Sequence, residues 1–281
     1  MELFVSTSGT RSNSFHSATT LVQHGFRNIE LSGGSHVVDL ESCLETLVSQ
    51  TDAIMLHNYF PPPSEPFVFN LASSNSETIT LSMSLAKSAI EISGKYGFPF
   101  FGIHAGFLMD PQVSELGNKI QATKLQDRYL ALEIFTHNAL ELSAFAQEKN
   151  VRILVENNVL SEENMKSFGE DPFLLSSTTE IFNFFQNNGG EIGFLLDLGH
   201  FNVSTNTLNE PREYSLEKIN EYVVGYHLHD NTRLSDQHLS LSDDSWFLSS
   251  LNPKAKFGTL EIHSQNIDEI QSSIRILEGV F

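Results

Sequence analysis

The chain has 281 residues, of which 40% are hydrophobic, and its 35 acidic side chains outnumber the 16 basic ones, for a formal net charge of −19. At this length that apolar fraction can bury a sizeable core, which excludes a mainly disordered chain. A surface this negative repels a phosphate backbone and argues against stable binding to DNA or RNA. Small phosphate-bearing substrates are not excluded, because a bound divalent cation can reverse the field inside a cleft.

Cysteine content and hydropathy indicate the compartment. Cys43 is the only cysteine, which rules out an intrachain disulfide and a thiolate zinc cluster and fits a reducing compartment. The residues Met1–Ser6 lack the basic and apolar segments of a secretory signal, and no stretch approaches the roughly 18 apolar residues of a membrane span. We therefore expect a soluble, cytoplasmic protein that is not bound to a membrane, and the sequence leaves a homo-oligomer open.

Short apolar runs of strand length, rich in Val, Ile or Phe, recur along the chain. In chain order they are Leu3–Ser6, Arg27–Leu31, Ala53–His57, Phe100–His104, Arg152–Glu156, Gly193–Asp197, Val223–His229 and Thr259–Ile262. Strands that are buried on both faces of a parallel sheet have this appearance.

Longer segments between these runs carry apolar residues at three- and four-residue spacing, which predicts helices at Ser76–Lys95, Lys119–Glu148, Ser177–Asn187 and Asn266–Gly279. The segment Asn157–Asp171 is predicted to be a long loop. Eight strand–helix alternations over this length predict an α/β protein with one (β/α)8 barrel, a TIM barrel, as a single domain over residues 1–281. A dinucleotide or P-loop fold is not supported, because no glycine-rich phosphate-binding run follows any of the strands.

Side chains that can bind metal stand at the end of nearly every strand from the third onward. They are His57, His104, Glu156, Asp197, His200, His227, Asp236, His238 and Glu261. One histidine at a strand end is usually an ordinary hydrogen-bonded residue, but the carboxyl ends of barrel strands converge on one face. Four carboxylates and five imidazoles gathered there are costly to bury without positive charge, so the sequence predicts a divalent metal site. Nitrogen and oxygen donors without thiolate suit zinc or manganese better than calcium or magnesium.

The order and spacing of several fragments resemble a known superfamily. The fragments are Leu154-Val-Glu156-Asn-Asn, Leu196-Asp197-Leu-Gly-His200, His227-Leu-His-Asp230-Asn231, Asp236-Gln-His238 and Leu260-Glu261-Ile. Together they are similar to the xylose isomerase-like barrels, which include sugar isomerases and epimerases and the AP endonucleases of the endonuclease IV type. The similarity to the epimerase branch implies one metal ion held by Glu156, Asp197, His227 and Glu261, with His200 facing the substrate. The similarity to the endonuclease branch implies three ions that use all nine residues.

Two further residues are predicted to contact substrate. His229 shares strand parity with His227 and is expected to face the mouth of the barrel, although a role behind the ligands stays open. Arg233 lies beside the ligand loop and is the candidate anchor for an anionic substrate, because Lys and Arg are scarce in this chain. Glu30, within Ile-Glu-Leu-Ser, resembles a motif on the second strand of these barrels but is given no role.

The favoured function is a metal-dependent isomerase or epimerase acting on a sugar, sugar phosphate or related polyol. Glu156 and Glu261 resemble the pair of carboxylates that take and return a proton through an enediolate. The alternative is a metal-dependent phosphoester hydrolase with a trinuclear site, although the chain lacks a basic run that could hold duplex DNA. A third interpretation, a non-catalytic ligand-binding barrel, predicts the loss of some ligand positions, and none is lost.

Overall fold

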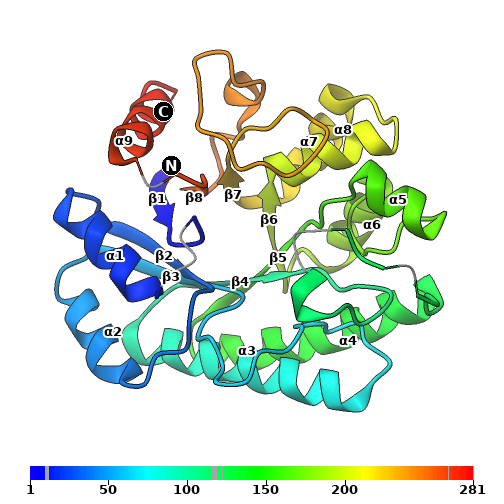
Figure 1. The fold of residues 1–281 in the computed structure, drawn as a ribbon, viewed down its shortest axis with the longest axis horizontal. Coiled ribbons are helices and arrows are strands. Elements are labelled where there is room, and N and C mark those ends of the chain that lie inside the picture. The colour runs from blue at the N-terminus through cyan, green and yellow to red at the C-terminus, as the bar shows by residue number, and fades with distance from the viewer. Residues whose placement is uncertain (10–12, 116–118, 122, 265, 281) are drawn as a thin grey trace.

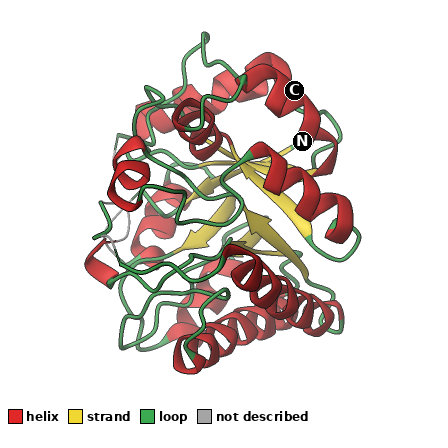
Figure 2. Cartoon of the chain, turned by 90° about the vertical axis from the view of Figure 1, so that its right-hand side faces the viewer, coloured by secondary structure: helices red, strands yellow, loops and turns green. Residues whose placement is uncertain are grey.

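The computed structural model describes residues 1–9, 13–115, 119–121, 123–264 and 266–280. Eight parallel strands close into a barrel in chain order, and the helices surround it (Figures 1 and 2). The strands are β1 (Glu2–Ser6), β2 (Asn28–Ser32), β3 (Ala53–His57), β4 (Phe100–His104), β5 (Arg152–Glu156), β6 (Gly193–Asp197), β7 (Val223–Leu228) and β8 (Phe257–Leu260). The first and last strands pair side by side, which completes the predicted (β/α)8 barrel.

The helices lie on the outside of the barrel, where all but the last connect one strand to the next. They are α1 (Ser14–Gln23), α2 (Leu40–Val48), α3 (Ser76–Tyr96), α4 (Arg128–Gln147), α5 (Glu162–Phe168), α6 (Thr178–Asn188), α7 (Leu198–Thr207), α8 (Arg212–Ile219) and α9 (Ile267–Glu278), with short 3₁₀ turns at Val113–Glu115, Asn220–Tyr222 and Leu248–Ser250. Within the described ranges, no helix is long and apolar enough to cross a membrane.

Strand β8 begins at Phe257 rather than at the predicted Thr259, and two predictions for the segments between strands are wrong. Helix α4 begins at Arg128 rather than Lys119, because the Asp127 side chain accepts the Leu130 N–H and caps the helix there. The predicted loop Asn157–Asp171 contains the helix α5, whose start is capped in the same way by Ser161.

The barrel interior has an apolar layer below a polar one. Phe4, Met55, Leu154, Leu195 and Phe257 pack together as a small cluster, separate from the larger core between the strands and the helices. Successive side chains of a strand point to opposite faces, so residues two positions after these interior residues also point inward. The polar ends of the strands therefore project into the barrel above the apolar layer.

Candidate metal centre

The structure brings all nine predicted ligands to the carboxyl ends of the strands. His57, His104, Glu156 and Asp197 are the last residues of β3, β4, β5 and β6, and Glu261 directly follows β8. Register places neighbours opposite each other, with His104 paired to Glu156 and Asp197 paired to His227. Three groups of potential ligand atoms result, each with its members within 4.8 Å of one another.

The Glu156 carboxylate lies at the centre of the site and is fully buried. Its Oε2 is 2.7 Å from Nε2 of His57 and 3.3 Å from Nδ1 of His104, while its Oε1 is 3.3 Å from Nδ1 of His227. Burial alone would raise the pKa of Glu156, but the imidazoles of His104, His227 and His57 outweigh burial and lower this pKa well below its ordinary value. Glu156 is therefore an anion placed to attract cations from two sides.

The first group, which we call the Glu156 site, consists of Glu156, Asp197, His227 and Glu261, all of them buried. Nδ1 of His227 is 2.9 Å from Oε2 of Glu261 and 3.8 Å from Oδ2 of Asp197. Three buried carboxylates and one buried imidazole match the nitrogen and oxygen donors that zinc and manganese accept. The donor set therefore fits a divalent ion.

Glu30 orients His227, a contact that the sequence interpretation missed. This carboxylate is fully buried on β2, and its Oε2 accepts a hydrogen bond of 2.9 Å from Nε2 of His227. With Nε2 occupied in this way, Nδ1 of His227 is the nitrogen that faces the Glu156 site. The available signal was strand parity, because Glu30 pairs in register with Met55 of the barrel interior.

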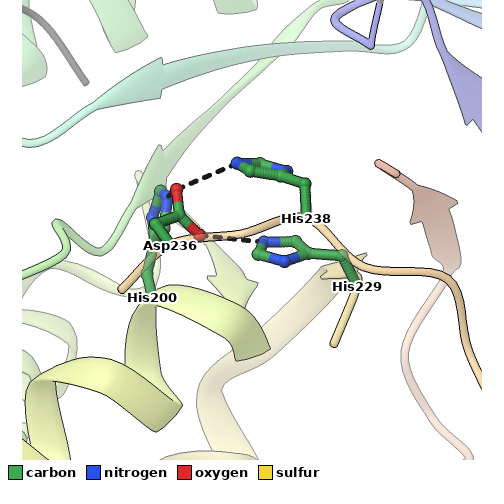
Figure 3. Close-up of side chains that lie close together, drawn as sticks. All are labelled: His200, His229, Asp236 and His238. Atoms are coloured by element: carbon green, nitrogen blue, oxygen red, sulfur yellow. Dashed lines mark hydrogen bonds and ion pairs between the residues drawn. The ribbon is translucent and has the colours of Figure 1, made fainter. Parts of the chain in front are cut away.

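The second group, which we call the Asp236 site, consists of His200, His229, Asp236 and His238 (Figure 3). Oδ2 of Asp236 is 2.9 Å from Nε2 of His238 and 3.3 Å from Nε2 of His200. Nδ1 of His200 donates to the carbonyl of Asn157 at 2.9 Å. Because a carbonyl oxygen only accepts, Nδ1 of His200 holds a proton and Nε2 is left to face the site.

His238 has the same arrangement as His200. Its Nδ1 donates to the carbonyl of Glu261 at 2.8 Å, so its Nε2 also faces Asp236. Burial would lower the pKa of His238, but the hydrogen bond to Asp236 and the charges of Glu261 and Asp236 outweigh burial and raise this pKa to about 9. A metal ion at this site must displace the proton on Nε2 of His238, so metal binding releases protons to the solvent.

The third group joins His57 and His104 to Glu156 and contains the most exposed single side chain of the three groups. The His104 side chain is 32% exposed, whereas that of His57 is 2% exposed. Gly102 makes room for the His57 ring, because a Cβ at this position would lie 2.3 Å from Cδ2 of His57. Since Glu156 belongs to both this group and the Glu156 site, the two groups share one carboxylate.

Strands β2 to β8 and the nine predicted ligands fall within a region that matches a known protein family. A family model described as xylose isomerase-like TIM barrel matches residues 19–266. The chain belongs to this family. No curated protein matches the sequence.

Solved structures with the same fold cover nearly the whole chain. A D-tagatose 3-epimerase-like protein has a TM-score of 0.72 and 17% identity over 100% of this chain and 97% of its own. The TTHB071 protein from Thermus thermophilus, soaked with ZnCl2, has a TM-score of 0.65 and 15% identity over 99% of both chains. A D-psicose 3-epimerase from Clostridium cellulolyticum, with D-tagatose, has a TM-score of 0.66 and 10% identity over 100% of this chain and 99% of its own. At these identities, the similarity establishes the xylose isomerase-like fold.

Besides His200, two residues were predicted to contact substrate, and they occupy different depths of this xylose isomerase-like barrel. His229 is fully buried, with Nε2 3.1 Å from both carboxylate oxygens of Asp197, so its side chain lies behind the ligands rather than on the open mouth. Arg233 is half-buried in the loop between β7 and Asp236, with a φ of 70°. The Asn231 side chain accepts the Arg233 N–H at 2.9 Å and holds this left-handed turn.

Proposed function

We propose that the protein is a metal-dependent isomerase or epimerase that acts on a sugar, sugar phosphate or related polyol. The observation that carries the proposal is the Glu156 site, where ligand atoms of Glu156, Asp197, His227 and Glu261 lie within 4.8 Å of one another at the mouth of the barrel. Solved structures of similar fold include proteins named D-psicose 3-epimerase and L-ribulose 3-epimerase, which supports a sugar substrate.

The Glu156 site would hold zinc or manganese. Three buried carboxylates in contact repel one another unless positive charge balances them. When bound, a divalent ion supplies positive charge that stabilises the negative charge developing on substrate oxygens.

Glu156 and Glu261 are assigned the proton transfer. They stand on β5 and after β8, so they can approach a substrate from two sides of the mouth. One carboxylate takes the proton from the carbon next to the substrate carbonyl, which leaves an enediolate, and a carboxylate returns a proton to the neighbouring carbon or to the opposite face. The Glu261 side chain is 10% exposed against 1% for Glu156, so Glu261 is the more accessible of the two.

Two basic side chains are assigned to substrate binding. His200 lies beside the Glu156 site, with Nδ1 3.4 Å from Oε1 of Glu156, and can contact a substrate hydroxyl. Arg233 would bind an anionic or hydroxyl group of the substrate, in line with its place in the loop that carries Asp236.

The experiment is a proton-exchange assay that does not require the product to be known. Purified protein loaded with zinc or manganese is incubated in D2O with a panel of ketoses, aldoses and their phosphates, and NMR follows loss of the carbon-bound proton next to the carbonyl. We expect metal-dependent exchange with at least one sugar. Absence of exchange and of isomerisation across the panel, with the Glu156 site loaded, would contradict the proposal.

A second candidate function is hydrolysis of a small phosphoester. The observation in its favour is the presence of two further groups, His57 with His104 and Glu156, and the Asp236 site. Multi-ion clamps are typical of enzymes that cleave phosphoesters. The net charge of −19 opposes duplex DNA as the substrate and leaves small phosphorylated molecules open.

A further inference from the structure

His229 lies between the carboxylates of two separate metal-binding groups. Its Nε2 is 3.1 Å from Oδ1 and Oδ2 of Asp197 and 3.7 Å from Oδ1 of Asp236, the latter contact drawn in Figure 3. Asp197 belongs to the Glu156 site, and Asp236 belongs to the Asp236 site. One nitrogen of a fully buried imidazole is therefore hydrogen-bonded to a member of the Glu156 site and lies near a member of the Asp236 site.

The hydrogen-bond pattern indicates which nitrogen of His229 holds the proton. Nδ1 is buried and has no hydrogen-bond partner in the described part of the chain. A proton on Nδ1 would therefore be a buried donor without an acceptor, which costs about 1–3 kcal/mol. Nε2 lies 3.1 Å from both carboxylate oxygens of Asp197, which accept, so the neutral ring is protonated at Nε2. His200 and His238 show the opposite arrangement, with Nδ1 donating to a carbonyl and Nε2 left as the ligand.

The position of the ring also separates His229 from the ligands. The His229 and His238 rings stack with their centroids 3.9 Å apart and an angle of 16° between their planes. An ion bound by imidazole lies about 2.0–2.1 Å from nitrogen and close to the ring plane, which two nearly parallel stacked rings cannot both satisfy. Gly199 fixes the ring from the other side, because a Cβ there would lie 1.9 Å from Cε1 of His229.

We propose that His229 is a positioning residue rather than a fourth ligand of the Asp236 site. Its Nε2–H donates to the carboxylate of Asp197 and holds it in the orientation in which Asp197 faces the Glu156 site. The role of Asp197 as a ligand rests on the proposed function, whereas the hydrogen-bond role of His229 is measured by metal binding alone.

The first experiment is zinc competition titration in a background that isolates the Glu156 site. His104→Leu with His238→Leu weakens the other two groups, and His229→Leu or His229→Gln is then added. Gln can place an amide N–H near the position of Nε2, whereas Leu cannot donate. We expect His229→Leu to weaken zinc binding about 10- to 100-fold, and His229→Gln to stay within about threefold of the background. The matched control is His263→Leu in the same background, which removes a nearby histidine ring that belongs to none of the three groups.

An unchanged zinc affinity of His229→Leu in this background, together with weaker binding by His229→Leu in the otherwise native chain, would assign His229 as a ligand of the Asp236 site and overturn the proposal. A second measurement needs no variant. Nitrogen NMR of the native protein with labelled histidine should show Nε2 of His229 protonated both without metal and with zinc bound. A zinc-bound Nε2 would also overturn the proposal, whether or not any sugar is turned over.

Discussion

At the scale of single residues, Glu261 is expected to act both as a ligand and as a proton carrier. Glu261→Gln keeps the shape of the side chain but removes its charge and its ability to accept a proton. We expect turnover to fall by about 100-fold or more, even when zinc or manganese is supplied in excess. The measurement is kcat as a function of metal concentration, with the exposed Glu217→Gln on α8 as the matched control. If added metal fully restores turnover in Glu261→Gln, Glu261 is a metal ligand and not a proton carrier.

Glu30 can be used to test whether a carboxylate that is hydrogen-bonded to a ligand strengthens metal binding. Its carboxylate accepts the Nε2–H of His227 and favours a basic Nδ1, so Glu30→Gln should weaken zinc binding at the Glu156 site by about tenfold, and Glu30→Leu by more. Zinc competition titration measures both variants. Equal affinity in Glu30→Leu and in the native protein would show that Glu30 is only a packing residue.

His104 separates the two candidate reactions. In the isomerase interpretation, the ion at the Glu156 site remains in His104→Ala, so sugar turnover should stay measurable. In the hydrolase interpretation, the same change removes a ligand of an ion in a multi-metal clamp, and the expected loss is roughly a thousandfold or more. Both proteins are assayed on sugars, sugar phosphates and a generic phosphodiester. Phosphodiester cleavage that disappears in His104→Ala, without sugar turnover in either protein, would reverse our preference.

At the scale of elements, the sequence predicted the strands better than the helices around the mouth. The strands β3 to β6 match their predicted bounds, because a fully buried strand is a short apolar run with a clear beginning and end. Helix α7 has no amphipathic pattern to reveal it, since all its residues from Leu198 to Thr205 are buried. The segment before α4 misled the prediction because Ile120 and Leu125 pack with a cluster under the loops rather than on a helix face.

The alternation of side chains along each strand was enough to predict which residues of a single strand belong to the site. Glu156 and Asp197 lie two positions after the interior residues Leu154 and Leu195, so their side chains must also point into the barrel, at its mouth. Contacts made across the barrel were not predictable in this way, because Glu30 and His227 are 197 residues apart and meet only when the barrel closes. The depth of His229 depends in turn on the close approach of α7 at Gly199, which the strand pattern does not contain.

This approach of α7 to β7 can be tested by adding one carbon atom. Gly199→Ala would place a Cβ 1.9 Å from the His229 ring, so either the helix or the ring must move. We expect a loss of about 1–3 kcal/mol in the free energy of unfolding, measured by chemical denaturation. Gly190→Ala is the matched control, because a Cβ there meets nothing within 4 Å. Equal stability of the two variants would mean that α7 is not held closely against His229.

At the scale of the whole molecule, bound metal should stabilise the fold. The Glu156 site contains three buried carboxylates, from β5, β6 and the end of β8. When no cation is present, the repulsion between these carboxylates acts across much of the barrel. A ligand that binds only the folded state at 100 times its Kd adds about 2.7 kcal/mol to the free energy of unfolding. For a chain of this size, that corresponds to an increase in Tm of about 5 °C.

The measurement compares Tm for protein treated with a chelator and protein with zinc restored. Asp197→Asn is the control, because it removes a charge from the Glu156 site and leaves the ligands of the Asp236 site in place. The increase in Tm on adding zinc should therefore be smaller in Asp197→Asn than in the native protein. An equal increase in both proteins would mean that the stabilising ion binds elsewhere. No increase in either would contradict a metal centre at the mouth of the barrel, since buried carboxylates cannot gain a neutralising cation without the folded state gaining stability.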